Sequence, residues 1–133
     1  MYTHEVSEIT NHIKVMVFPR FQMEKSDIPA NKFVYSYKVV IENLGKEAVQ
    51  LLNRHWIIIS DEKQIVDIKG EGVIGEQPIL MPGKSHEYTS WTVVDSPDGR
   101  MYGTYTFKSE SGDFFDATIP RFNLIYLDPD TLH

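Results

Sequence analysis

Three glycines in the chain follow the spacing of a nucleotide-binding loop. Gly70, Gly72 and Gly75 form a G-x-G-x-x-G motif, which in dinucleotide-binding folds follows a strand and opens a helix whose N-terminus receives a pyrophosphate. Pro78 and Pro82 stand where that helix would run, and proline breaks a helix interior. We therefore expect a structural loop that needs positive φ angles and close backbone approach. A small-anion, nucleotide or pyrophosphate site at this loop is the alternative.

The triplet Arg54-His55-Trp56 is the second group whose side chains could bind a ligand. Arginine and tryptophan dominate the energetics of many binding surfaces. Neighbouring side chains of a strand point to opposite faces, so the pattern predicts His55 on one face with Leu51 and Ile57, and Arg54 on the other with Trp56. We interpret the triplet mainly as core packing with a structural hydrogen bond. Arg54 and His55 nevertheless join the glycines, so the candidate ligand-binding residues are Arg54, His55, Gly70, Gly72 and Gly75.

The chain has few residues of the types and spacing that catalysis or a metal site requires. It has no cysteine, which excludes thiol nucleophiles, cysteine-based zinc sites and iron–sulfur clusters. Its five histidines show no metal-ligand spacing, and no serine lies in a G-x-S-x-G motif. Asp128, Asp130 and His133 could chelate an ion weakly, but we interpret them as a solvated chain end. We predict no enzymatic activity, no cofactor and no metal site.

Composition is typical of one soluble globular domain. The 133 residues are 41% hydrophobic and 24% charged, and a domain of this length forms a core without disulfide or metal staples. The net charge of -6 argues against nucleic acid and anionic lipid as partners, since both bind through positive charge. No apolar run approaches the ~18 residues of a membrane span, and no signal sequence is visible. We expect a cytoplasmic protein without membrane insertion, one domain over residues 1–133 with its core at about 13–124.

The elements that must position these residues are strands. Apolar residues alternate with polar ones in short segments bounded by turn signals, which is typical of an all-β sandwich or barrel. Residues 48–60 are apolar on both faces, which indicates a central strand. Pro19 and Pro120 are expected to end or edge their strands. We predict an antiparallel two-sheet β-sandwich of immunoglobulin or fibronectin type III character, with a closed barrel as the alternative. The expected strands, about seven, cover 12–18, 32–43, 48–60, 64–69, 84–94, 101–108 and 114–119.

Two ordered blocks of sequence carry a family resemblance. Residues 49–56 read VQLLNRHW and residues 70–78 read GEGVIGEQP. Together with further matches along nearly the whole chain, they closely resemble the bacterial ApaG family. The further matches are Leu80, Pro82-Gly83, Tyr88-Thr89-Ser90, Pro97, Gly99, Met101, Gly103, Tyr105, Phe115, Ile119-Pro120 and Phe122. One departure is Trp91, where family members commonly have glycine; on an edge strand it would enlarge an apolar contact surface, and elsewhere it would fill a core gap.

The resemblance implies a fibronectin type III-like sandwich and no established enzymatic activity. Family members carry a label that associates them with cobalt and magnesium efflux, and related domains occur in eukaryotic F-box proteins and in a polymerase-delta-interacting protein. We therefore predict a non-enzymatic interaction domain with an unidentified protein partner. Without a membrane span, any link to cobalt and magnesium homeostasis would be regulatory. The sequence leaves a homo-oligomer open.

Overall fold

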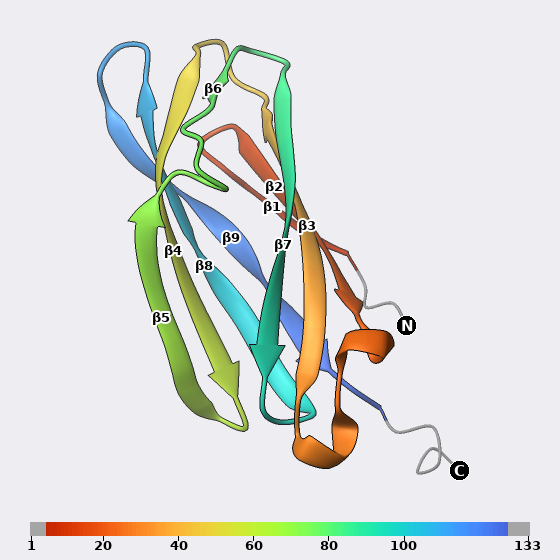
Figure 1. Ribbon diagram of the computed structural model, residues 1–133. Coiled ribbons are helices and arrows are strands. Elements are labelled where there is room, and N and C mark those ends of the chain that lie inside the picture. Colours follow the sequence, from red (N-terminus) through yellow and green to blue (C-terminus); the bar gives the residue numbers. More distant parts are fainter. Residues whose placement is uncertain (1–4, 128–133) are drawn as a thin grey trace.

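Two antiparallel β-sheets pack face to face in the computed structural model, which describes residues 5–127 (Figure 1). The elements are β1 (Val6–Thr10), β2 (Ile13–Phe21), the 3-10 turns η1 (Met23–Lys25) and η2 (Ile28–Ala30), β3 (Phe33–Asn43), β4 (Val49–Ser60), β5 (Lys63–Glu71), β6 (Ile79–Leu80), β7 (Ser85–Val94), β8 (Asp98–Ser109) and β9 (Phe114–Ile125). One sheet has the order β1-β2-β3-β7. The other has the order β5-β4-β8-β9, with β6 paired to β4. The predicted two-sheet sandwich is confirmed.

The core lies between the two sheets and is built from alternate residues of each strand. In β2, for example, Ile13, Val15 and Val17 are buried while the residues between them are not, because successive side chains of a strand point to opposite faces. Trp56 of β4 sits centrally. Its ring lies 5.4 Å from that of Tyr37 on the facing sheet, an edge-on contact that adds to the energy of burial.

Strand β4 is central, as its apolar character predicts. It pairs with β8 along one side and with β5 and β6 along the other. One residue of β4, Leu52, has no partner in the register to β8, where Leu51 pairs with Phe107 and Asn53 with Thr106. Such a bulge shifts the side-chain alternation by one residue.

The bulge corrects one prediction about the Arg54-His55-Trp56 triplet. Leu51, before the bulge, is fully buried, whereas His55, after it, lies on the outer face and contacts Asp67. His55 and Leu51 therefore do not share a face. The predicted pairing of Arg54 with Trp56 holds, because both follow the bulge and both line the space between the sheets.

Strand number and strand ends also differ from the prediction. Residues 5–127 contain nine strands rather than about seven, because β1 and the two-residue β6 lack a clear alternating signal. Pro19 lies inside β2 instead of ending it, whereas Pro120 lies inside β9, which is an edge strand as one form of the prediction expected. Pro120 is tolerated because β9 is the edge strand of its sheet and the register to β8 shifts beside it, between Gly103–Ile119 and Met101–Phe122; edges and bulges are where a strand accepts proline.

The two lateral margins of the sandwich, where the edge strands of the two sheets face each other, differ in whether they are closed. On one side β1 and β2 lie against β9, so this side is closed. Because the sheets end with β7 and β5 at their other margins, these two edge strands flank the opposite side (Figure 1). Gly70 lies near the end of β5, and Gly72 and Gly75 follow it, so the three predicted glycines lie at or next to this open side.

Candidate functional site

A cavity of about 280 Å³ opens at the open side, between β5 and β7. We call it the interlayer slot. Its floor is apolar and buried, its mouth carries exposed apolar side chains, and five polar side chains line it. The lining includes the floor residues Trp56, Ile58, Val73 and Met101, the mouth residues Ile68, Ile74 and Trp91, and the polar residues Tyr37, Arg54, Tyr88, Ser90 and Thr92. Apolar walls with a few convergent polar groups are typical of ligand-binding sites.

Tyrosine hydroxyl groups form the polar part of the slot. The hydroxyls of Tyr88 and Tyr105 hydrogen-bond to each other, and Tyr37 shares a hydrogen bond with Ser90. Burial raises the pKa of Tyr37, Tyr88 and Tyr105 above the ordinary value of 10.0, because an ionised phenol loses its hydration inside the protein. All three are therefore neutral at physiological pH and can both donate and accept hydrogen bonds.

Arg54 joins the slot to the glycine loop. Its Nη1 atom donates hydrogen bonds of 2.9 Å to the carbonyl oxygens of Glu71 and Gly72. Its guanidinium lies against Gly70, where a Cβ atom would come within 3.0 Å of Cζ. The same positive charge lowers the pKa of Tyr37, Tyr88 and Tyr105, against the larger effect of burial. Arg54 therefore fixes the loop and also makes the inner end of the slot electropositive.

The glycine loop is closed by its own backbone hydrogen bonds. Val73 and Glu76 bond to each other in both directions, at 2.8 and 3.0 Å, and the Gly72 amide donates to Leu52. Gly72 has a φ of 61°, and a Cβ atom there would lie 2.1 Å from the Glu76 carbonyl oxygen. Gly75 also has a positive φ, of 75°. These geometries agree with the predicted structural loop, and β6 rather than a helix follows it.

His55 lies away from the other candidates. Its Nε2 atom is 2.6 Å from Oδ1 of Asp67 on the outer face of the sheet. A surface depression there is lined by His55 together with Arg54 and Gly70. The fold thus brings Arg54 and Gly75 to the slot, holds Gly70 and Gly72 against Arg54 beside it, and leaves His55 on the outer face.

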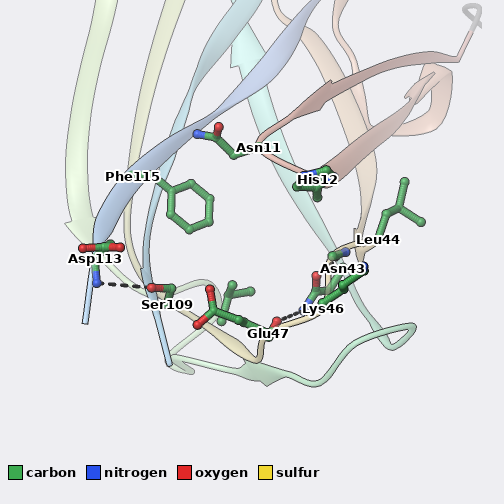
Figure 2. Close-up of a pocket in the computed structure, with 11 residues that line it drawn as sticks. Asn11, His12, Asn43, Leu44, Lys46, Glu47, Ser109, Asp113 and Phe115 are labelled. Atoms are coloured by element: carbon green, nitrogen blue, oxygen red, sulfur yellow. Dashed lines mark hydrogen bonds between the residues drawn. The ribbon is translucent and has the colours of Figure 1, made fainter. Parts of the chain in front are cut away.

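A larger cavity lies at one end of the sandwich. It has a volume of about 660 Å³, and Figure 2 shows the side chains around it, from the β1–β2, β3–β4 and β8–β9 turns. Asn43 is its buried polar residue. The Asn43 Nδ2 atom donates to the carbonyl oxygens of Glu47 and Leu80, and its Oδ1 accepts from the Gly45 amide. The Asn43 side chain is thus occupied in stabilising the turn, through both its amide nitrogen and its oxygen. The end cavity is therefore a weaker candidate for a ligand site than the slot.

A family model of the ApaG domain matches residues 23–109. The chain belongs to the ApaG family. It is 45% identical over 116 residues to protein ApaG of Bradyrhizobium sp. (strain ORS 278), which covers 87% of this chain and 89% of the relative. Protein ApaG of Thiobacillus denitrificans is 42% identical over 121 residues, or 91% of this chain and 94% of the relative. A crystal structure of a protein from Bordetella pertussis matches with a TM-score of 0.82 at 40% identity, over 85% of this chain and 92% of that one.

The ApaG sequence blocks contain the slot residues that pattern analysis missed. Tyr88 and Ser90, which line the slot, belong to the matched positions, as does Tyr105, which bonds to Tyr88 behind it, but nothing local marked them as members of a site. Their spacing predicts only that Tyr88 and Ser90 share a face of β7. That this face meets Arg54 of β4 follows from the packing of one sheet on the other.

The described residues of this ApaG-family chain form neither a metal-ligand cluster nor a membrane-spanning helix. Across residues 5–127, no three His, Asp or Glu side chains gather closely enough to hold a metal ion. The predicted chelating candidates Asp128, Asp130 and His133 lie outside the described residues. No helix within the described part of the chain has the length and apolar character needed to cross a membrane.

Proposed function

We propose that this ApaG-family chain is a non-enzymatic domain that binds an extended segment of a protein partner along the edge of β7. The topology carries the proposal: within residues 5–127, β7 pairs with β3 along one side and with no strand along the other. The unpaired backbone groups of an edge strand are a template for a further strand, and strand addition is a common way to bind peptides.

The β7 edge lacks two of the features that usually protect an edge strand, and its one charged side chain, Glu87, is paired with Lys38. Its ten residues contain no proline, and its register to β3 runs without a bulge. On the outer face, Trp91 is 49% exposed and Val93 51%, and the Lys25 ammonium lies 5.4 Å from the Trp91 ring centre. The interpretation of Trp91 as part of a contact surface therefore fits better than a core-filling role.

Strand β5 is the weaker candidate for the same function. It is also an edge strand, and Ile68 on it is 48% exposed. However, its register to β4 shifts at Ile58 and Ile59, and Lys63 and Lys69 lie along it. Bulges and lysines are devices that keep edge strands from pairing.

The residues around the slot support a role without catalysis. Its polar lining consists of neutral tyrosines, hydroxyls and Arg54, and among residues 5–127 no histidine or carboxylate lines it to serve as a general base. We further propose that the domain acts in the cytoplasm, and that any link to cobalt and magnesium homeostasis runs through the protein partner.

Affinity capture with matched variants tests the proposal. The double variant Trp91→Lys/Val93→Lys places two charges on the β7 edge, and Ile9→Lys places one on β1, the opposite edge of the same sheet, where Ile9 is 59% exposed. Tagged wild type and Ile9→Lys should retain the same cytosolic proteins, and the double variant should lose them. The β7 amides should also gain protection from hydrogen exchange in the captured complex. Retention by the double variant together with loss by Ile9→Lys would contradict the proposal.

A further inference from the structure

We propose that the interlayer slot binds a small carboxylic acid that carries a compact apolar body. The proposal concerns the space between the sheets and does not depend on the protein partner at the β7 edge. Trp56, Ile58 and Met101 form an apolar floor, and Ile68 and Ile74 stand at the mouth. With a volume of about 280 Å³, the slot lies just below the roughly 300–1,000 Å³ of sites for drug-sized ligands. It therefore suits one ring or a short aliphatic chain.

The charge of Arg54 indicates that the ligand is an anion. Arg54 is the one residue lining the slot that carries a formal charge at neutral pH, and it forms no ion pair within residues 5–127. Its hydrogen bonds use Nη1 alone, toward the neutral carbonyls of Glu71 and Gly72. The donors on Nε and Nη2 remain for a ligand. A partly buried guanidinium gains most from a carboxylate, which accepts charge-assisted hydrogen bonds in a matching fork geometry.

The glycine loop argues against a phosphate or polyphosphate. Phosphate-binding loops present several free amides to the anion, whereas the amides of Gly72, Val73 and Glu76 are used within the protein and only those of Ile74 and Gly75, at the tip of the turn, have no partner within residues 5–127. Glu71 and Glu76 add negative charge to the loop. One guanidinium with neutral hydroxyls beside it matches a single negative charge. The anion alternative thus becomes a carboxylate at Arg54 rather than a pyrophosphate at the glycine amides.

Besides Arg54, two hydrogen-bonded pairs of hydroxyl groups lie at the polar end of the slot. Tyr88 bonds to Tyr105, and Tyr37 to Ser90. Each hydroxyl has one donor and two acceptor positions, so the pairs retain capacity for a ligand oxygen. The Arg54 charge acts on Tyr37 and Tyr88, which places the guanidinium and the hydroxyls at the same end. A ligand would therefore enter with its apolar body against the floor and its carboxylate toward Arg54.

Titration with 3-phenylpropionate, followed by two-dimensional NMR and tryptophan fluorescence, tests the inference. We expect saturable binding with a Kd below about 1 mM, and shifts of the Trp56 indole and of the Arg54 and Ser90 signals. The uncharged analogue 3-phenylpropanol should bind at least tenfold more weakly, because it cannot pair with Arg54. Inorganic pyrophosphate should leave these signals unchanged.

Three variants test whether binding of the acid depends on residues of the slot. Ser90→Leu fills the slot from β7 without touching the contacts of Arg54 to the loop, so it should abolish binding while the NMR spectrum still shows the folded domain, with a melting temperature lowered only by the loss of the Tyr37–Ser90 hydrogen bond. Arg54→Gln should remove the preference for the acid over the alcohol. His55→Gln, on the outer face, is the matched control and should bind as wild type does. Equal binding of acid and alcohol, unchanged binding by Ser90→Leu, or no binding of 3-phenylpropionate at 10 mM, about tenfold above the expected Kd, would overturn the inference.

Discussion

Tyr35 and Tyr105 are both fully buried, but their hydroxyl groups differ. The Tyr105 hydroxyl bonds to Tyr88, whereas the Tyr35 hydroxyl has no hydrogen-bond partner within residues 5–127. A buried hydroxyl without a partner loses its bonds to water and gains nothing in return. The Tyr35 ring still packs well, 5.3 Å from the ring of Phe21. Tyr35 thus contributes through its ring, and its hydroxyl opposes folding.

Removal of the Tyr35 hydroxyl and removal of the Tyr105 hydroxyl should therefore change the free energy of unfolding differently. We expect Tyr35→Phe to leave the free energy of unfolding unchanged or to raise it by up to about 1 kcal/mol, because only the unpaired hydroxyl is lost. Tyr105→Phe should lower it by about 1 kcal/mol or more, because the Tyr88 hydroxyl then loses its partner. Urea unfolding of the two variants measures both. A larger loss for Tyr35→Phe than for Tyr105→Phe would contradict this account.

At the scale of elements, the segment from β5 to β6 shows how a loop can resemble a ligand site and yet serve the fold. Val73 at its centre is 1% exposed and belongs to the core. The Val73–Glu76 hydrogen bonds close the loop, and Arg54 holds its start. Gly72 and Gly75 adopt positive φ without strain, whereas Ile74 between them also has a positive φ, of 47°, which a β-branched residue adopts only at a cost that the surrounding loop contacts offset.

The two positive-φ glycines of this loop should differ in their sensitivity to alanine. At Gly75 a Cβ atom would meet nothing within 4 Å, so Gly75→Ala should cost only the strain of positive φ, about 1 kcal/mol. At Gly72 the Cβ atom would also collide with the Glu76 carbonyl oxygen, so Gly72→Ala should cost clearly more. Thermal unfolding of both variants gives the comparison. Equal losses would show that close approach at Gly72 has no energetic role.

At the scale of the whole molecule, buried tyrosines set the limit of stability at high pH. Burial raises the pKa of Tyr35, Tyr37, Tyr88 and Tyr105 above 10.0. Above pH 10 the unfolded chain therefore releases protons that the folded chain keeps. Because the unfolded state then binds fewer protons, the free energy of unfolding must fall as pH rises.

We accordingly expect stability to be steady from pH 8 to near pH 10 and to decline above it. Urea midpoints at pH 8, 10 and 11 measure the decline. Absorbance of ionised tyrosine should rise in two phases, with four of the seven tyrosines ionising only as the protein unfolds. A single phase centred near pH 10, with the fold intact, would contradict the burial of these hydroxyls.

Metal affinity is also a property of the whole molecule, because ligands must converge from several elements. His55 pairs with Asp67, and His86 lies 3.9 Å from Glu76, but neither pair gains a third ligand within residues 5–127. We expect calorimetric titration with cobalt or magnesium to give no affinity tighter than the high-micromolar range, since both ions need more donors. Stoichiometric binding at low micromolar concentration, lost in His55→Ala or His86→Ala, would instead make the domain a metal sensor.

The sequence alone determined the fold class, because the rules behind it are local. Alternation places Tyr35, Tyr37 and Val39 on one face of β3 whatever that strand packs against. Residues 48–60, apolar on both faces, identify the central strand in the same way. The glycine spacing and the prolines after it predict a loop and exclude a following helix. The ordered sequence blocks, in turn, identify the ApaG family.

Only the tertiary structure decided where the site lies and which residues share it. The extra residue at Leu52 reverses the alternation along β4, and no local rule predicts a bulge there because its cause is the register to β8. Tyr88 of β7 and Arg54 of β4 line the same cavity because the two sheets pack face to face, which depends on strand order rather than on spacing. Contacts between sheets join residues far apart in the chain, so periodicity within one strand carries no information about them.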